Sequence, residues 1–131
     1  MAARLDRSIK TSIVKQLQRD NELMHKTRNL IQKEFKVLHN KMMKDFESHP
    51  VTRELKSGPN ASSSSGLTPR GNLFSFIGFN VETDPLSTVE SLLQKTEIIL
   101  KRRSIGTKGL IWTYIITAPS LNDLYKATPM P

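Results

Sequence analysis

The feature that most constrains this fold is the stretch before Pro50, which contains neither proline nor glycine. Apolar side chains recur along it every three or four residues, the period of an amphipathic helix: Leu5, Ile9, Ile13, Leu17, Met24, Ile31, Phe35, Leu38, Met42 and Phe46. The apolar phase drifts at Asp20-Asn21, where a break fits, and Pro50 disfavours helix at the preceding residue. We therefore predict one long helix over residues 2–48.

Residues 49–72 are rich in serine, glycine and proline, including Ser57-Gly58-Pro59-Asn60 and the serine run 62–65. These residue types favour turns and linkers. The sequence thus predicts a long flexible loop, and a loop of this length in a small domain is commonly functional or disordered.

The remaining residues, 73–131, predict a small α+β core. Aromatic and β-branched residues favour a strand over 73–79, with Phe74, Phe76 and either Ile77 or Phe79 buried. A helix is expected from Pro85 or Ser87 to about Lys95, then a hairpin with strands 96–105 and 109–118, and a last helix capped by Ser120. The second hairpin strand is apolar on both faces, which suggests a central or covered strand.

The predicted class is therefore α+β: a long N-terminal helix, and a small, mostly antiparallel sheet of three or more strands with a β-hairpin and two short helices. The chain of 131 residues has room for one core. We expect one domain made of the helix 1–48, the loop 49–72 and the core 73–131.

Composition narrows the functional classes. The absence of cysteine excludes disulfides, cysteine zinc sites and a thiol nucleophile, and weakly favours a reducing compartment. The charged N-terminus does not resemble a signal peptide, and the apolar runs are too short to span a bilayer. We expect a soluble protein, made in the cytoplasm, with no membrane partner.

The formal net charge of +8 and the pI of 10.0 favour an acidic partner or nucleic acid. The residues up to 49 hold eleven Lys/Arg and six Asp/Glu, and the hairpin adds Lys101, Arg102, Arg103 and Lys108. Strand alternation predicts Lys101 and Arg103 on one face and Arg102 on the other. Two explanations of these charges stay open. They lie on a solvated helix face and at strand edges, or they contact phosphates or an acidic subunit.

Catalytic and cofactor motifs are not recognisable in the sequence. His25, His39 and His49 lack metal-ligand spacing, and phosphate-binding glycine loops, nucleophile elbows and zinc-protease motifs are missing. We predict neither enzymatic activity nor any cofactor or metal. An enzyme whose carboxylates meet only in the folded chain is the remaining rival.

Several segments between Phe46 and the end of the chain resemble bacteriophage neck or tail-completion proteins of the head–tail joining class. The resemblance covers about two-thirds of the sequence and is carried by residues 49–52, 58–61, 71–79, 84–85 and 128–131, which read His-Pro-Val-Thr, Gly-Pro-Asn-Ala, Gly-Asn-Leu-Phe-Ser-Phe-Ile-Gly-Phe, Asp-Pro and Thr-Pro-Met-Pro. It implies a small α+β structural protein without enzymatic activity, assembled as a ring between portal and tail.

From this resemblance we expect a virion protein at the head–tail interface, a homo-oligomeric ring beside portal, adaptor and tail proteins that lines or flanks the DNA channel. Contact with DNA phosphates would not depend on sequence. The position in the neck and the copy number, six or twelve, stay open, and a stand-alone DNA-binding protein is the alternative function. The candidate interface or channel residues are Phe74, Phe76, Phe79, Asn60, Arg70, Lys101, Arg102, Arg103 and Lys108.

Overall fold

The computed structural model describes residues 2–64, 66–67, 71–107 and 109–129. The chain forms two compact units, which we describe separately. The hairpin unit comprises Met1–Val37 and Glu97–Thr117, and the helical unit comprises Leu38–Thr96 and Ala118–Pro131. These units differ from the three consecutive segments expected from the sequence, because the hairpin belongs with the N-terminal helices and not with its sequence neighbours.

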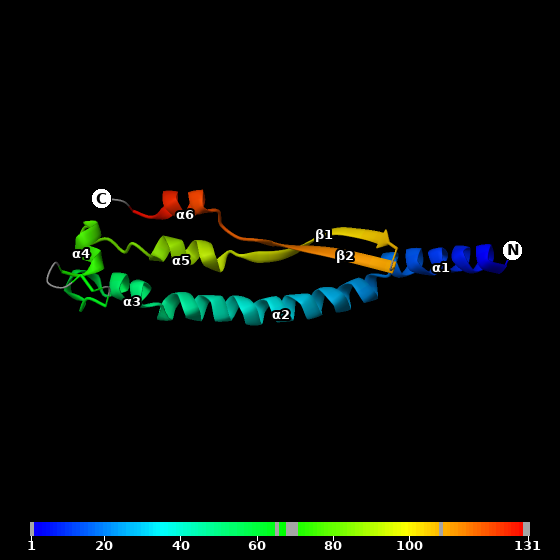
Figure 1. Ribbon diagram of the computed structural model, residues 1–131, viewed down its shortest axis with the longest axis horizontal. Helices are drawn as coiled ribbons and strands as arrows, with labels where there is room; N and C mark the ends of the chain where they lie inside the picture. Colours follow the sequence, from blue (N-terminus) through cyan, green and yellow to red (C-terminus); the bar gives the residue numbers. More distant parts are fainter. Residues whose placement is uncertain (1, 65, 68–70, 108, 130–131) are drawn as a thin grey trace. The chain divides into compact units, whose positions relative to one another are not determined.

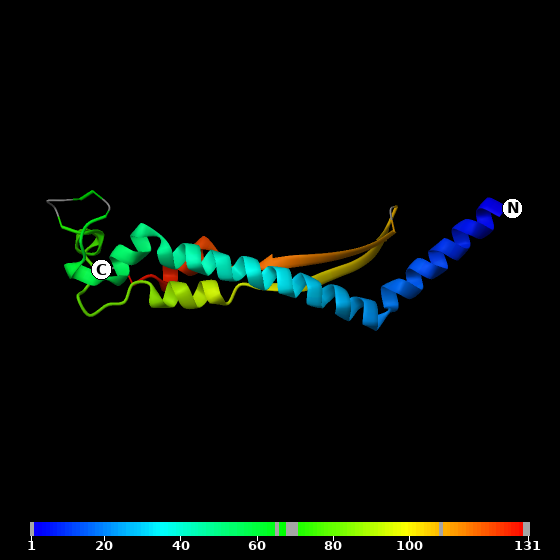
Figure 2. The same cartoon turned by 90° about the horizontal axis from the view of Figure 1, so that it is seen from below.

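The α+β class is confirmed, with a long helical N-terminus, an antiparallel hairpin and short helices. The N-terminal helix is interrupted once, at the expected place: α1 spans Ala2–Arg19 and α2 spans Asn21–Ser48. The Asp20 carboxylate accepts hydrogen bonds from the backbone N–H groups of Glu22 (2.9 Å) and Leu23 (3.1 Å). Asp20 therefore caps a new helix, and Figure 2 shows the change of direction there.

In the hairpin unit, β1 (Glu97–Gly106) pairs with β2 (Gly109–Thr117) in an antiparallel sheet (Figure 1), as the turn residues predicted. Among the described residues the sheet has these two strands alone. The predictions of three or more strands and of β2 as a central strand are therefore wrong. A β-bulge shifts the register between Leu100 and Arg102, so Lys101 has no partner residue in β2.

The helical unit begins with the C-terminal part of α2 and continues with α3 (Pro50–Lys56) and the 3₁₀ turn η1 (Gly58–Asn60). The prediction of a loop from residue 49 is wrong over this part. Pro50 ends α2, but proline is also favourable at the first position of a helix. His49 caps α3 by accepting a hydrogen bond from the Val51 N–H at 3.3 Å.

The predicted strand over residues 73–79 is also wrong, because Leu73–Ile77 form helix α4. The Asn72 side chain caps its start by accepting a hydrogen bond from the Ser75 N–H at 3.0 Å. Gly78 ends it in the left-handed conformation at φ 87°, where glycine is favoured. These two signals outweigh the β propensity of the aromatic residues between them.

The predicted helices nearest the C-terminus are confirmed as α5 (Ser87–Gln94) and α6 (Leu121–Ala127), which contact each other. Ser120 and Asp123 form a reciprocal capping box at the start of α6. Helices α2 and α5 are joined by a hydrogen bond of 3.1 Å between the His39 imidazole and the Leu93 carbonyl. The buried hydrophobic side chains of this unit are Met43, Phe74, Phe79 and Leu86.

Candidate assembly surfaces

A buried carboxylate organises one end of the helical unit. Glu54, on α3, is 3 % exposed. One of its oxygens accepts hydrogen bonds from the backbone N–H (3.1 Å) and the hydroxyl (2.9 Å) of Ser64, and the other accepts from the Leu73 N–H at 2.6 Å. Glu54 thus joins three segments, α3, the serine-rich segment and the start of α4.

Asn72, which is 3 % exposed, adds a second set of bonds to the same segments. Its side-chain amide donates to the carbonyl oxygens of Gly58 (2.9 Å) and Ala61 (3.0 Å), while its oxygen caps α4. The described part of the predicted loop is therefore held by buried polar side chains. Such bonds stabilise strongly because an unpaired buried partner is costly.

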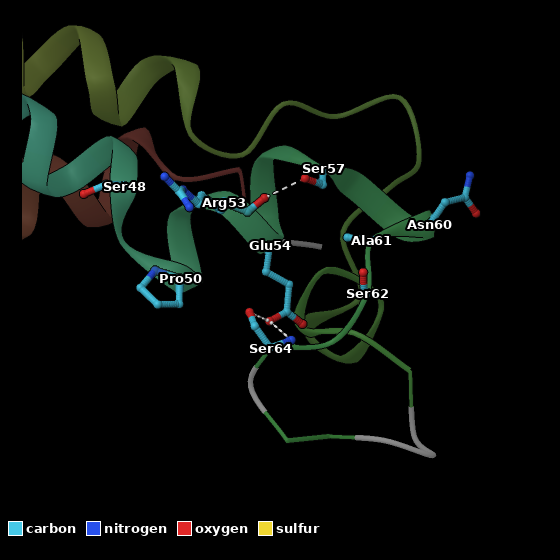
Figure 3. Close-up of a pocket in the computed structure, with 9 residues that line it drawn as sticks. All are labelled: Ser48, Pro50, Arg53, Glu54, Ser57, Asn60, Ala61, Ser62 and Ser64. Atoms are coloured by element: carbon cyan, nitrogen blue, oxygen red, sulfur yellow. Dashed lines mark hydrogen bonds between the residues drawn. The ribbon is translucent and has the colours of Figure 1, made fainter.

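A cavity of about 450 Å³ lies beside this network (Figure 3). The Glu54 carboxylate points toward Ser64, whereas the Asn60 amide points away from the other labelled side chains. The lining is mainly polar and consists of Ser48, Pro50, Arg53, Glu54, Ser57, Asn60, Ala61, Ser62 and Ser64. Because both oxygens of Glu54 accept hydrogen bonds from the chain, its contacts are those of a structural anchor.

The three candidate phenylalanines differ in exposure. Phe74 is 2 % and Phe79 9 % exposed, with ring centroids 5.5 Å apart, whereas Phe76 is 59 % exposed. The prediction that Phe76 is buried with Phe74 is wrong, because two residues along a helix turn the side chain by about 200°. Phe74 and Phe79 therefore belong to the core, and Phe76 lies on the surface.

The bulge decides which way the hairpin charges point. Residues paired across the two strands share a face, and Arg103 pairs with Trp112 whereas Arg102 pairs with Thr113. Arg103 donates to the Met24 sulfur of α2 at 3.4 Å, so its face is the inner one. The predicted alternation of Lys101 with Arg103 on one face does not hold, because the extra residue at the bulge reverses the alternation beyond it.

The opposite, open face of the hairpin combines basic and apolar side chains. Its exposed residues are Glu97, Ile99 and Arg102 of β1 with Ile111, Thr113 and Thr117 of β2, beside the half-buried Ser104 and Ile115, and Lys101 is exposed at the bulge. The two aromatic residues of β2 lie on the inner face, where Trp112 and Tyr114 line cavities shared with α2. The open face therefore lacks aromatic side chains among the described residues.

Asn60 is exposed at the end of η1, and Arg70 and Lys108 lie outside the described residues. Sequence reasoning missed Glu54 and Asn72. Asn72 was recognisable as a helix cap six residues before Gly78, but nothing in the sequence marks Glu54, a single acidic residue in a short segment.

Among the described residues no group of three or more His, Asp or Glu side chains is arranged to hold a metal ion. In the same part of the chain no helix is both long and apolar enough to cross a bilayer. The chain matches no protein-family model, no curated protein and no solved structure.

Proposed function

We propose that this protein is a non-enzymatic structural subunit of a phage head–tail connector, a ring of the neck or tail-completion type that joins head to tail and lines or flanks the DNA channel. The resemblance of residues 49–52, 58–61, 71–79, 84–85 and 128–131 to head–tail joining proteins supports the place in the virion. The chain's surface supports the assembly role.

The observation that carries the proposal is an excess of accessible surface. The chain exposes 10086 Å² for a mass of 14.9 kDa. Two separate compact units that share this mass would expose about 8,500 Å² by the usual scaling. The excess is roughly 1,600 Å², measured against two units that bury no surface against each other. One partner in a standard interface buries about 800 Å², so two neighbouring subunits would cover about this much of the chain's surface.

Much of this surface is apolar. Val81 is 71 % and Leu121 86 % exposed, and both belong to the helical unit together with Phe76. Single exposed hydrophobic residues are ordinary, but here they outnumber the four that form the buried core among the described residues. A subunit that buries this surface only on assembly explains the imbalance.

The test is the oligomeric state of the purified chain, measured by native mass spectrometry and mass photometry over a range of concentrations and salt. We expect a discrete oligomer without DNA, or one that forms on a purified portal or tail protein. Phe76→Ser should abolish it while leaving the folded chain's stability within about 0.5 kcal/mol. Asn80→Ser, an exposed change in the same unit, is the control. A chain that stays monomeric alone and with both virion proteins would contradict the proposal.

The net charge of +8 favours a second candidate, a sequence-nonspecific nucleic-acid-binding protein. It differs from the connector in acting as a monomer. A chain that coats duplex DNA without forming a discrete oligomer would favour it.

A further inference from the structure

The net positive charge of this protein resides in one of its two units. The hairpin unit, residues 1–37 and 97–117, contains thirteen Lys/Arg and five Asp/Glu, whereas the helical unit contains seven of each. The net charges are therefore +8 and zero, and together they account for the whole chain. A charge confined to one unit points to a binding surface there more strongly than the same charge spread evenly would.

The basic side chains of the hairpin unit are available to a ligand. All eleven whose side chains are described are exposed: Arg7, Lys10, Lys15, Arg19, Lys26, Arg28, Lys33, Lys36, Lys101, Arg102 and Arg103. Two of them form ion pairs, Lys10 with Asp6 (3.3 Å) and Lys26 with Glu22 (2.8 Å). The other nine pair with no carboxylate that the structure describes, so no described side chain neutralises their charge.

Two features of the unit present these charges on surfaces. The bulge leaves Lys101 exposed beside Arg102 on the open face of the hairpin. A cavity of about 410 Å³ between α1 and the hairpin turn is lined by Arg7 and Lys10, by the hydroxyls of Thr11 and Thr107, and by apolar and glycine residues. Guanidinium, ammonium and hydroxyl donors are the groups that contact phosphates in protein–DNA complexes.

We propose that the hairpin unit is the part of this protein that binds the sugar–phosphate backbone of duplex DNA, with Lys101 and Arg102 as direct contacts. This inference rests on the proposed function, since it assigns the DNA contact of a connector subunit to one unit. A duplex fits better than a single strand, because single-strand binding uses aromatic stacking. On the described open face there is no aromatic side chain, and Trp112 and Tyr114 lie on the opposite one.

The experiment measures fluorescence anisotropy of a labelled mixed-sequence duplex with the full chain over a series of KCl concentrations. The open-face variant is Lys101→Glu with Arg102→Glu. The matched control is Lys41→Glu with Lys44→Glu, two exposed lysines of α2 in the helical unit. Both double variants lower the formal net charge by four, and circular dichroism confirms that both are folded.

We expect the open-face variant to bind the duplex about tenfold or more weakly, with the slope of log K against log salt reduced by about two. The control should change affinity by no more than about twofold, since its charges lie in the other unit. Equal losses in both variants would overturn the proposal, because net charge alone would then explain binding. The proposal would also be overturned if the chain bound the matching single strand, or phosphatidylserine vesicles, more tightly than the duplex.

Mass photometry on the same samples separates this inference from the proposed function. A discrete oligomer with no duplex affinity refutes the DNA contact and keeps the connector. Duplex binding through Lys101 and Arg102 by a strict monomer keeps the contact and refutes the ring.

Discussion

Glu54 accepts a hydrogen bond of 2.6 Å from the backbone N–H of Leu73, nineteen residues further along the chain. The same carboxylate holds Ser64. This single side chain therefore fixes the start of α4 relative to α3 and to the serine-rich segment, and its position decides where Phe74 and Phe76 lie.

Replacing Glu54 by alanine should strongly destabilise the helical unit. Three donors in a buried site lose their acceptor, so we expect a loss of roughly 2–4 kcal/mol in the free energy of unfolding, measured by urea denaturation. Glu47→Ala, an exposed change on α2, is the control and should cost about 0.5 kcal/mol or less. Unchanged hydrogen exchange at the Ser64 and Leu73 amides in Glu54→Ala would show that this network is not formed.

The two roles of Asn72 can be separated by two substitutions. Asn72→Ala removes both the cap of α4 and the bonds to Gly58 and Ala61, whereas Asn72→Ser restores a good capping residue without the amide donors. We expect the serine variant to be about 1 kcal/mol more stable than the alanine variant, and both to be less stable than the native chain. Equal unfolding free energies of the two variants would argue against the cap.

Deleting Lys101 should leave the hairpin paired. Leu100 opposes Tyr114 and Arg102 opposes Thr113, so without the bulged residue the two pairs follow each other in a regular ladder. We expect cross-strand nuclear Overhauser effects between positions 103 and 112 to persist, with reduced local twist. Deletion of Arg103 instead would move Ser104 opposite Trp112 and reverse the faces beyond it. Loss of the 103–112 contacts on deletion of Lys101 would contradict the assigned register.

The capping box of α6 should depend on acid pH. Hydrogen bonds from the Ser120 hydroxyl, and then from the Ser120 backbone N–H, lower the pKa of Asp123 below its ordinary value of 3.8. A lowered pKa in the folded state gives a stabilisation that is complete above the ordinary value and is lost as pH falls through the lowered one. Asp123→Asn should abolish this dependence, measured as the chemical shift of the Ser120 amide against pH. An unchanged titration in the variant would assign it to another group.

The sequence predicted those elements that have strong local signals. Asp20 and Pro50 mark helix boundaries, the glycines of the turn mark the hairpin, and Ser120 caps α6. It failed at 73–79, where β propensity competes with the cap Asn72 and the left-handed Gly78. It also failed at α3, because Pro50 both ends one helix and begins another.

The site features depend on contacts that are distant in sequence. Glu54 and Leu73 are nineteen residues apart in the sequence, and the bulge reverses strand alternation without any marker at Lys101. The sequence predicted the total net charge but not how it is divided between the two units. That division follows only once the hairpin is known to belong with the N-terminal helices, which leaves the helical unit with no net charge.

This distribution has an electrophoretic consequence. The pI of 10.0 describes the whole chain. The helical unit taken alone, with seven basic and seven acidic residues, has an isoelectric point near neutrality. Around a polyelectrolyte, the force on net charge acts on the hairpin unit, whereas the helical unit feels only the weaker force of the field gradient on its separated charges. The chain would be attracted mainly through the hairpin unit, so its approach would be oriented before any contact is made.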